Sequence, residues 1–355
     1  MKTLALDIGV GTTDVMLVDS ERNPENCTKM VLPSAVQLYA SAVSHATKER
    51  KNLLIIGDTV GGGPFASALK AHVKAGLKVA MTETAAYSVR NDLDEVRERG
   101  IEVVEGASPP NGFGGETLWL QEVRLREIIH FLRASGEDAK VDAVAIAVQD
   151  HGVSPKGVSN RVTRIERFRQ IVSKDRRLES LCFEAGTIPE DFIRLRSAAE
   201  RARKEMPDAR VFVMDTSPAA ALGCLEDSEV DESGCVLTVN VGNGHTLAAL
   251  LQAGEVLGAM EAHTRAFDPK KLGKFLKGFL RSSLSNEDVF NDGGHGLFRL
   301  EDKLPKPDQI MVTGPNRSLM DGSGLRFGYA TPAGDVMMTG PVGLSRSLRY
   351  LLSRS

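Results

Sequence analysis

The stretch LALDIGVGTTDVMLVD, residues 4–19, decides the fold that this sequence predicts. An apolar run ends at Asp7, a turn with glycines at positions 9 and 11 follows, and a second apolar run begins after two threonines. Two apolar runs on either side of a short glycine-rich turn are typical of a β-hairpin. The carboxylate at the mouth of this turn is the feature that needs a chemical explanation.

The composition limits the classes of function. The chain has 355 residues and a net charge of −3, so it is long enough for two domains and has no basic field for nucleic acid. The start MKTLALDIG is not typical of a signal peptide, because its apolar run breaks at Asp7, and no window reaches the apolar length of a membrane span. We therefore expect a cytoplasmic protein with neither nucleic acid nor a membrane as a partner.

The pattern of the opening stretch occurs a second time. Residues 235–264, CVLTVNVGNGHTLAALLQAGEVLGAMEAHT, predict three short strands with glycines at positions 242 and 244 in the first turn. Along the rest of the chain, strand patterns alternate with helical ones, which predicts an α/β fold. Two equivalent glycine turns indicate an internally repeated fold with a cleft between two lobes.

Five motifs in order resemble those of the actin, heat-shock chaperone and sugar kinase superfamily (ASKHA), whose members grip ATP between two ribonuclease-H-like lobes. DIGVGTTD (7–14) is similar to its first phosphate motif, and VNVGNGHT (239–246) is similar to its second. IMVTGPNRSLM (310–320) resembles the adenosine motif. MDTSPAAALGCL (214–225) and GPVGLSRSL (340–348) resemble the two connecting helices.

This resemblance implies the domain organisation and the cofactor. The first lobe would span 1–225, with a small α/β insertion at about 53–115, and the second lobe would span 226–355. The cofactors would be ATP and Mg²⁺, with Asp7 and Asn240 at the metal. The residues implied to contact the nucleotide are Gly9, Gly11, Thr12, Thr13, Gly242, Asn243, Gly244, His245, Thr246, Gly314 and Asn316.

Physical chemistry supports the same assignment for the first turn. Glycines let the backbone approach a polyphosphate, and successive N–H groups on a hairpin form a concavity that binds anions. Thr12 and Thr13 can donate further hydrogen bonds to phosphate oxygens. A carboxylate repels phosphate, so the expected partner of Asp7 is Mg²⁺, held through water. The alternative is an ordinary β-hairpin with a polar turn.

Two departures from the family pattern concern turnover. Asn240 stands where many members have an aspartate that helps to hold the metal. The catalytic carboxylate of the chaperones aligns without a gap to Thr216, and Asp215 is one residue away. Asp7 and Asp215 are therefore catalytic candidates, but nucleotide binding is better supported than fast hydrolysis.

A third segment points toward sugar kinases. VDAVAIAVQDHGVSP (141–155) is similar to a strand of those enzymes that lines the cleft beside the γ-phosphate. Asp150 and His151 are catalytic candidates on this ground, since either could orient a water molecule or an acceptor hydroxyl. The alternative is a strand end with solvated polar residues.

The histidines raise a separate question. Four of the seven lie beside glycine or at predicted strand ends, namely His151, His245, His263 and His295. If they converge, they could serve as substrate, metal or proton-transfer groups. Scattered loop histidines are the alternative.

Two further stretches yield structural expectations. Residues 160–206, rich in Arg, Lys and Glu, predict two amphipathic helices with solvated charged faces, and a partner surface is the alternative. Residues 108–119 predict a loop, with Trp119 anchoring a helix over 119–134.

The sequence leaves three functions open. The expected one is Mg²⁺-dependent nucleotide hydrolysis or phosphoryl transfer in the cleft. The others are a sugar-kinase-like enzyme acting on a small molecule, and an ATP-switched activator of a partner enzyme without fast turnover. The chain also resembles a group labelled as pyruvate formate-lyase activating enzymes, but its four cysteines (Cys27, Cys182, Cys224 and Cys235) lack the C-x-x-x-C-x-x-C spacing of a radical cluster.

Overall fold

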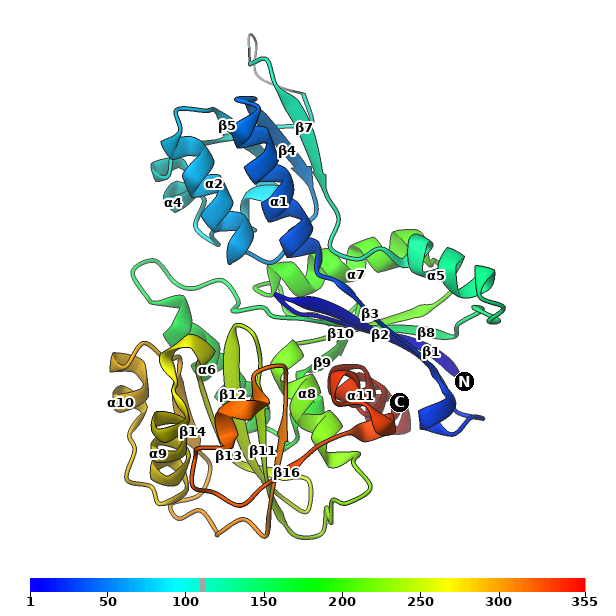
Figure 1. The fold of residues 1–355 in the computed structure, drawn as a ribbon, viewed down its shortest axis with the longest axis vertical. Helices are drawn as coiled ribbons and strands as arrows, with labels where there is room; N and C mark the ends of the chain where they lie inside the picture. The colour runs from blue at the N-terminus through cyan, green and yellow to red at the C-terminus, as the bar shows by residue number, and fades with distance from the viewer. Residues whose placement is uncertain (109–112, 355) are drawn as a thin grey trace.

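The computed structural model describes residues 1–108 and 113–354, and Figure 1 shows its sheets and the helices around them. The strands of the first sheet are β1 Lys2–Ile8, β2 Thr12–Asp19, β3 Thr28–Pro33, β8 Ala143–Val148, β9 Cys182–Glu184 and β10 Arg210–Met214. Their order is β3-β2-β1-β8-β10-β9. β1, β2 and β3 pair antiparallel, whereas β1, β8 and β10 run parallel.

The second sheet repeats this arrangement. Its strands are β11 Cys235–Val241, β12 His245–Gln252, β13 Glu255–His263, β14 Gly296–Arg299, β15 Gln309–Thr313 and β16 Gly328–Tyr329. Their order is β14-β13-β12-β11-β15-β16, with an antiparallel meander from β11 to β13 and parallel pairs from β11 to β16. Both lobes are thus ribonuclease-H-like, and the predicted two-lobed α/β fold is confirmed.

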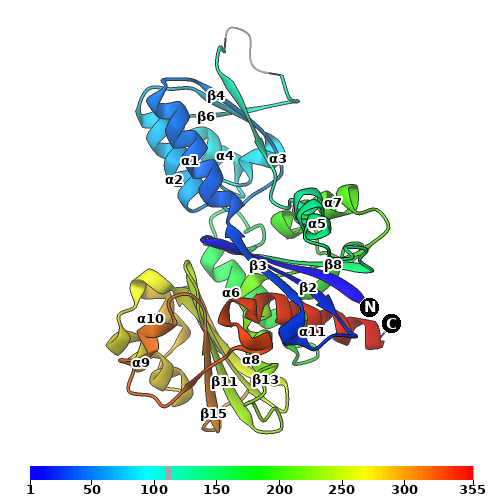
Figure 2. The same cartoon turned by 45° about the vertical axis from the view of Figure 1, so that its right-hand side comes forward.

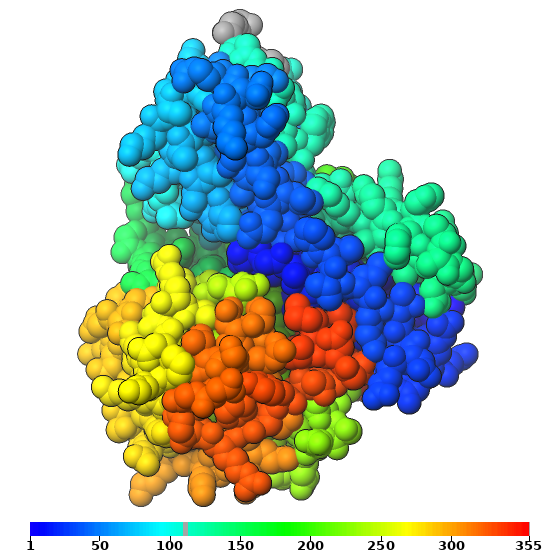
Figure 3. All heavy atoms as spheres, in the orientation of Figure 1, coloured from blue at the N-terminus to red at the C-terminus, as the bar shows by residue number. Residues whose placement is uncertain are grey.

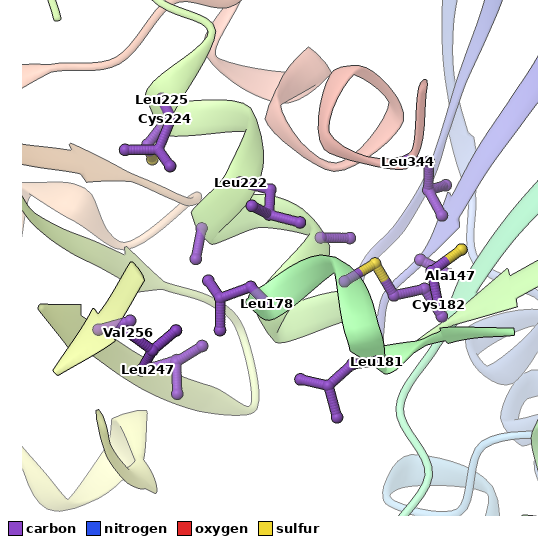
Figure 4. Packing of buried hydrophobic residues seen from close by; sticks show 14 of the residues in the cluster. Ala147, Leu178, Leu181, Cys182, Leu222, Cys224, Leu225, Leu247, Val256 and Leu344 are labelled. Carbon is purple, nitrogen blue, oxygen red and sulfur yellow. The ribbon is translucent and has the colours of Figure 1, made fainter. Parts of the chain in front are cut away.

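The two faces of the first sheet differ in side-chain size. Val144 and Ile146 of β8 belong to a buried cluster with residues of α5 (Leu125–Ala134) and α7 (Ile193–Glu205). Ala145 and Ala147 point the other way, into a cluster with residues of α8 (Thr216–Leu225) and α11 (Thr339–Arg354). Figure 4 shows this second cluster around α8, with side chains from both lobes. The small alanines leave room for two helices between the sheets.

These two helices cross between the lobes. α8 packs on β11, β12 and β15, and α11 packs on β1, β2 and β8, as well as on α8 (Figure 2). A Cβ atom at Gly223 would collide with the carbonyl oxygen of Thr339, and one at Gly343 with that of Ala219. Glycine is therefore required for this close approach. Because α11 follows the second sheet in sequence but packs on the first, the lobe boundary at 225/226 stays a prediction.

Helices α9 (Pro269–Leu280) and α10 (Asn286–Asn291) belong to the second lobe. Both contribute to a buried cluster with β11, β12 and β13, to which α9 adds Leu272, Phe275, Leu276 and Phe279. In Figure 1 they lie on the side of the second sheet away from α11. None of the helices in the described part of the chain is long and apolar enough to cross a membrane.

A third, smaller sheet lies in the predicted insertion. Its elements are α1 Ala35–Lys48, β4 Leu53–Gly57, α2 Pro64–Lys74, β5 Val79–Thr82, α3 Glu83–Ala86, α4 Leu93–Glu98, β6 Ile101–Val104 and β7 Glu116–Leu120. The four strands run parallel in the order β6-β5-β4-β7. α1 packs on α2 and into this core. The unit therefore includes α1 and β7, which lie outside the range 53–115.

The expectation for residues 108–119 was wrong where the structure tests it. Residues 109–112 lie outside the described part, but residues 116–120 form β7, which pairs with β4. Trp119 is 66% exposed on this strand and anchors no helix, and α5 begins only at Leu125. Residues 119 and 120 were expected in a helix but pair with β4 instead, because tertiary contacts override the secondary-structure preference of a short segment.

Candidate functional site

The two glycine turns, one from each lobe, meet. Gly11 lies in the turn after β1, so close to the second turn that a Cβ atom on it would collide with the side-chain amide of Asn243. On the other side, a Cβ atom on Gly244 would lie 3.6 Å from the side chain of Val10. β1 and β11 hold the same place in their sheets, so the turns are topologically equivalent. Figure 3 shows a recess above them, between the second lobe and the α1–α2 unit.

The second turn is braced by the adenosine motif. The side-chain amide of Asn316 donates to the Gly242 carbonyl at 3.1 Å, and the Thr264 hydroxyl donates to the same carbonyl at 2.7 Å. Gly314 has a φ of +96°, a left-handed conformation that favours glycine, and a Cβ atom on it would also meet Asn240 and Val241. The structure thus brings the residues predicted from these two motifs into one place.

The first turn is held by Ser34 at the start of α1. Its hydroxyl donates to the Gly9 carbonyl at 2.7 Å, and its backbone N–H donates to the Gly11 carbonyl at 3.3 Å. Thr12 directs its hydroxyl toward the carboxylate of Asp14 at 3.4 Å, and Thr13 is buried. The turn is therefore fixed by contacts on its outer side, and the nucleotide roles of Thr12 and Thr13 stay predictions.

Asp7 faces a second buried carboxylate. Asp7 and Asp14 are directly opposite one another in the β1–β2 pair, and one oxygen of Asp14 is buried without a hydrogen-bond partner. The Thr216 hydroxyl donates to Asp7 at 2.5 Å. Burial raises the pKa of Asp7 to about 7, and burial together with the charge of Asp7 raises the pKa of Asp14 to about 8. Two buried carboxylates in this arrangement repel each other when both are ionised.

Asp215 is the N-cap of α8 and is held by an arginine. Arg164 of α6 (Asn160–Val172) donates to both oxygens of Asp215, at 2.7 and 2.9 Å. The same guanidinium donates to both oxygens of Glu261 on β13, and all three side chains are buried. Burial alone would raise the pKa of Glu261, but the charge of Arg164 lowers it well below its usual range. Arg164 thus ties the two lobes together.

Asp150 caps a helix. One of its oxygens accepts from the backbone N–H groups of Arg194 and Leu195 at the start of α7, and the other accepts from that of Gly152. Burial raises the pKa of Asp150, against these hydrogen bonds. Arg194 is itself paired with the buried Glu122 and donates to the Gln149 carbonyl. The catalytic roles of Asp150 and Asp215 stay predictions, but both carboxylates already have structural partners.

The four loop histidines converge. The ring centroids of His245 and His295 are 4.7 Å apart, and that of His263 lies 4.7 Å from the first and 5.0 Å from the second. The Nε2 atoms of His151 and His295 are 3.1 Å apart. Burial lowers the pKa of His245 and of His295 to about 3, and lowers that of His151 and His263 as well. A cavity of about 30 Å³ borders His151.

Four residues of this site were not predicted from the sequence. Arg164 and Arg194 were expected on solvated helix faces, but Arg164 is buried and Arg194 largely so, and both are held in ion pairs, so that expectation was wrong for them. Glu261 was not singled out, although a single carboxylate within the apolar run EVLGAMEAH was a usable signal, since buried charges are paired. Asp14 was also given no role, although counting outward from the turn along both strands of the predicted hairpin places it opposite Asp7.

Comparisons with known proteins complete the description. A family model described as "Putative pyruvate format-lyase activating enzyme (DUF1786)" matches residues 60–319, and no curated protein matches the chain. In solved structures, the chain is similar to the PilM-PilN type IV pilus biogenesis complex (13% identity, TM-score 0.42, 98% of both chains). It is also similar to a Bacteroides thetaiotaomicron protein with actin-like ATPase fold and unknown function (9% identity, TM-score 0.38, covering 96% of this chain and 95% of that one). The ROK hexokinase from Thermus thermophilus is similar too (12% identity, TM-score 0.35, covering 100% of both chains). These similarities are low, and the fold is assigned from the order of the strands.

Proposed function

The chain belongs to the DUF1786 family, and we propose that it binds a purine nucleotide with Mg²⁺ between its two glycine turns and hydrolyses it slowly. The observation that carries this proposal is the meeting of Gly11 and Asn243, which come from equivalent turns of two similar sheets. Backbone N–H groups on both sides of one gap form a clamp for a polyphosphate. The adenosine motif braces the same turn, through Asn316, where the base and ribose would follow.

The residues near Asp7 fit a divalent cation. Asp7 and Asp14 are opposed and buried, and the unpartnered oxygen of Asp14 offers a further ligand. Oxygen ligands of this kind suit Mg²⁺, which keeps several of its waters. Bound Mg²⁺ would neutralise charge on the polyphosphate. Asp7 and Asp14 would hold it, while Thr216 orients Asp7 through its hydrogen bond.

We expect slow turnover because the other two candidate carboxylates, Asp150 and Asp215, already make hydrogen bonds and an ion pair within the protein. Asp150 accepts three backbone hydrogen bonds, and Asp215 is paired with Arg164. A general base must be free to accept a proton from the attacking group. We therefore assign positioning roles to Asp150 and Asp215, which fix α7 and α8 beside the turns. On this proposal nucleotide binding is the main activity and hydrolysis is slow.

The test is nucleotide titration of the full chain by calorimetry and by thermal unfolding. We expect micromolar affinity for ATP or ADP with Mg²⁺, and about 2.7 kcal/mol of stabilisation at a hundredfold excess over Kd. Gly11→Val should abolish this effect because its side chain fills the gap to Asn243, whereas the control Gly186→Ala, at an open position, should keep it. Asp7→Ala should remove the Mg²⁺ dependence. The absence of a thermal shift with any purine nucleotide contradicts the proposal.

A second candidate function is an ATP-switched activator of a partner enzyme, favoured by the description of the family. A radical iron–sulfur version of this activity is not supported, because the four cysteines are buried on separate elements. Burial also raises the pKa of Cys182 to about 12 and that of Cys235 to about 11. A pull-down that depends on ATP would favour the activator, and ADP release that depends on an added sugar would favour a small-molecule kinase.

A further inference from the structure

The histidine cluster draws its members from four places in the chain. His151 follows β8 of the first lobe, His245 begins β12, His263 ends β13, and His295 precedes β14. One ring nitrogen from each of His151, His245 and His295 lies within 4.8 Å of the other two. Such convergence of imidazoles from two lobes needs a reason, since buried imidazoles gain nothing from facing one another.

Several ring nitrogens of this cluster lack partners. The Nε2 atom of His245 and the Nδ1 atom of His295 are buried without a hydrogen bond. At the contact between the Nε2 atoms of His151 and His295, 3.1 Å apart, at least one nitrogen must present a lone pair. Unpaired buried nitrogens are costly unless something binds them.

Groups behind the rings can orient them as ligands. The Gln149 side-chain Nε2 lies 2.7 Å from His245 Nδ1; with the amide turned over, its oxygen would accept a hydrogen bond from Nδ1–H instead and leave His245 Nε2 with a free lone pair. The carboxylate of Glu261 lies 3.9 Å from His295 Nδ1, on the far side of the ring from His151. This separation is too long for a hydrogen bond, but ligating histidines typically donate their second N–H to a carboxylate or carbonyl, and Glu261 is the carboxylate on this side of His295.

We propose that His151, His245 and His295 form a binding site for a divalent transition metal of the zinc class. In a tetrahedral site with metal–nitrogen distances of about 2.0–2.1 Å, the ligand nitrogens are about 3.3–3.4 Å apart. The 3.1 Å between His151 and His295 is close to this spacing, and a nitrogen of His245 lies within 4.8 Å of both. Three imidazoles with an open fourth position select zinc, cobalt, nickel or iron over Mg²⁺. The ring of His263 packs against those of His245 and His295.

The surrounding charges permit a cation. Arg164 is the nearest buried positive group, but it is paired with both Asp215 and Glu261, so this group of three carries a net charge of −1. Arg161 donates to the backbone carbonyls of Phe290 and Gly294, at 3.1 and 2.7 Å, and the charge of Arg265 acts on His263 and His245. The three ligands lie at the ends of strands from both lobes, so the metal site can form without bound nucleotide, although His245 also follows the second glycine turn.

The experiment uses the full chain without a polyhistidine tag, stripped of metal by chelator and titrated with Co²⁺. We expect visible d–d absorption that saturates at one Co²⁺ per chain, displacement by Zn²⁺, and no displacement by Mg²⁺. His151→Ala, His245→Ala and His295→Ala should each weaken Co²⁺ binding by about 100-fold or more, and Gln149→Ala by about tenfold. The control His130→Ala, exposed on α5, should bind as wild type does.

Thermal unfolding of each variant keeps the test decisive. His295 is buried, so its variant counts only if its melting temperature without metal matches wild type; His245 is less buried and supplies the same test. The absence of cobalt absorption in wild type, or unchanged binding in the His245 variant, overturns the proposal. Nucleotide binding is measured separately on the same samples, so failure of one proposal is distinguishable from failure of the other.

Discussion

The opposed pair of Asp7 and Asp14 leads to a prediction about stability and pH. The pKa of Asp14 is 3.8 in an unfolded chain and about 8 in the folded protein. Between these values the unfolded chain binds fewer protons, so the metal-free protein should lose stability as the pH rises from about 4 to about 8, where the loss is complete. Two charges about 5 Å apart at an effective dielectric near 20 repel by about 3 kcal/mol, and we expect a loss of this size.

Asp14→Asn isolates this effect, because an amide resembles the protonated carboxyl and cannot ionise. In the presence of chelator, wild type should lose about 3 kcal/mol of stability relative to the variant between about pH 4 and pH 9. Mg²⁺ with ADP should then stabilise wild type more than the variant. Asp19→Asn, at the other end of β2, is the matched control.

Thermal unfolding at several pH values measures the difference, at about 2–4 °C for each kcal/mol. Comparison with the variant cancels the titration of the histidines and other groups. If wild type gains stability relative to Asp14→Asn as the pH rises, or if Asp19→Asn behaves in the same way, the opposed carboxylates do not repel and the metal assignment loses its basis.

Two other predictions concern the lobes and the metal. Gly343→Ala should cost about 3 kcal/mol or more, because its methyl group would collide with the carbonyl of Ala219 and push α8 and α11 apart; Gly186→Ala is the control, and equal melting temperatures would refute this. Asn240→Asp should tighten Mg²⁺ binding about tenfold if Asn240 replaces a metal-binding carboxylate. Weaker ATP binding in that variant would show instead that the Asn240 amide donates to the ligand.

The repeated architecture could be predicted because its signals are local. The opening stretch and residues 235–264 each show apolar strands around a glycine turn, and this pattern predicted a hairpin in the first lobe and three short strands in the second. Gly11 and Gly242 were expected at a shared cleft, and they lie at turns that face one another. Such patterns predict the strands well, because the burial of one or both faces of a sheet sets which residues along each strand must be apolar.

The rest depended on contacts between distant segments. Arg164 and Glu261 are far apart in sequence, and nothing in the helical pattern of α6 indicates that one of its arginines faces the other lobe. Trp119 was misplaced because the strand it occupies forms only where β4 offers an unpaired edge. The four histidines were visible, but whether they converge is decided by how the lobes pack, which no local pattern records.

His245 belongs to both proposed sites, and this has a measurable consequence. It follows Gly244 directly in the second glycine turn, and its ring faces His295 at 4.7 Å. A ligand that moves the turn therefore moves one of the three imidazoles, and a metal that fixes His245 also fixes the turn.

Linkage then requires that Co²⁺ change the affinity for ADP by the same factor by which ADP changes the affinity for Co²⁺. We expect both affinities to rise, by about tenfold, since the fixed turn is already ordered for phosphate and the metal adds positive charge beside it. Calorimetric titrations in both orders measure the two factors. Equal factors near one would separate the sites and refute a shared turn, whereas His130→Ala, remote from both, should leave the coupling unchanged.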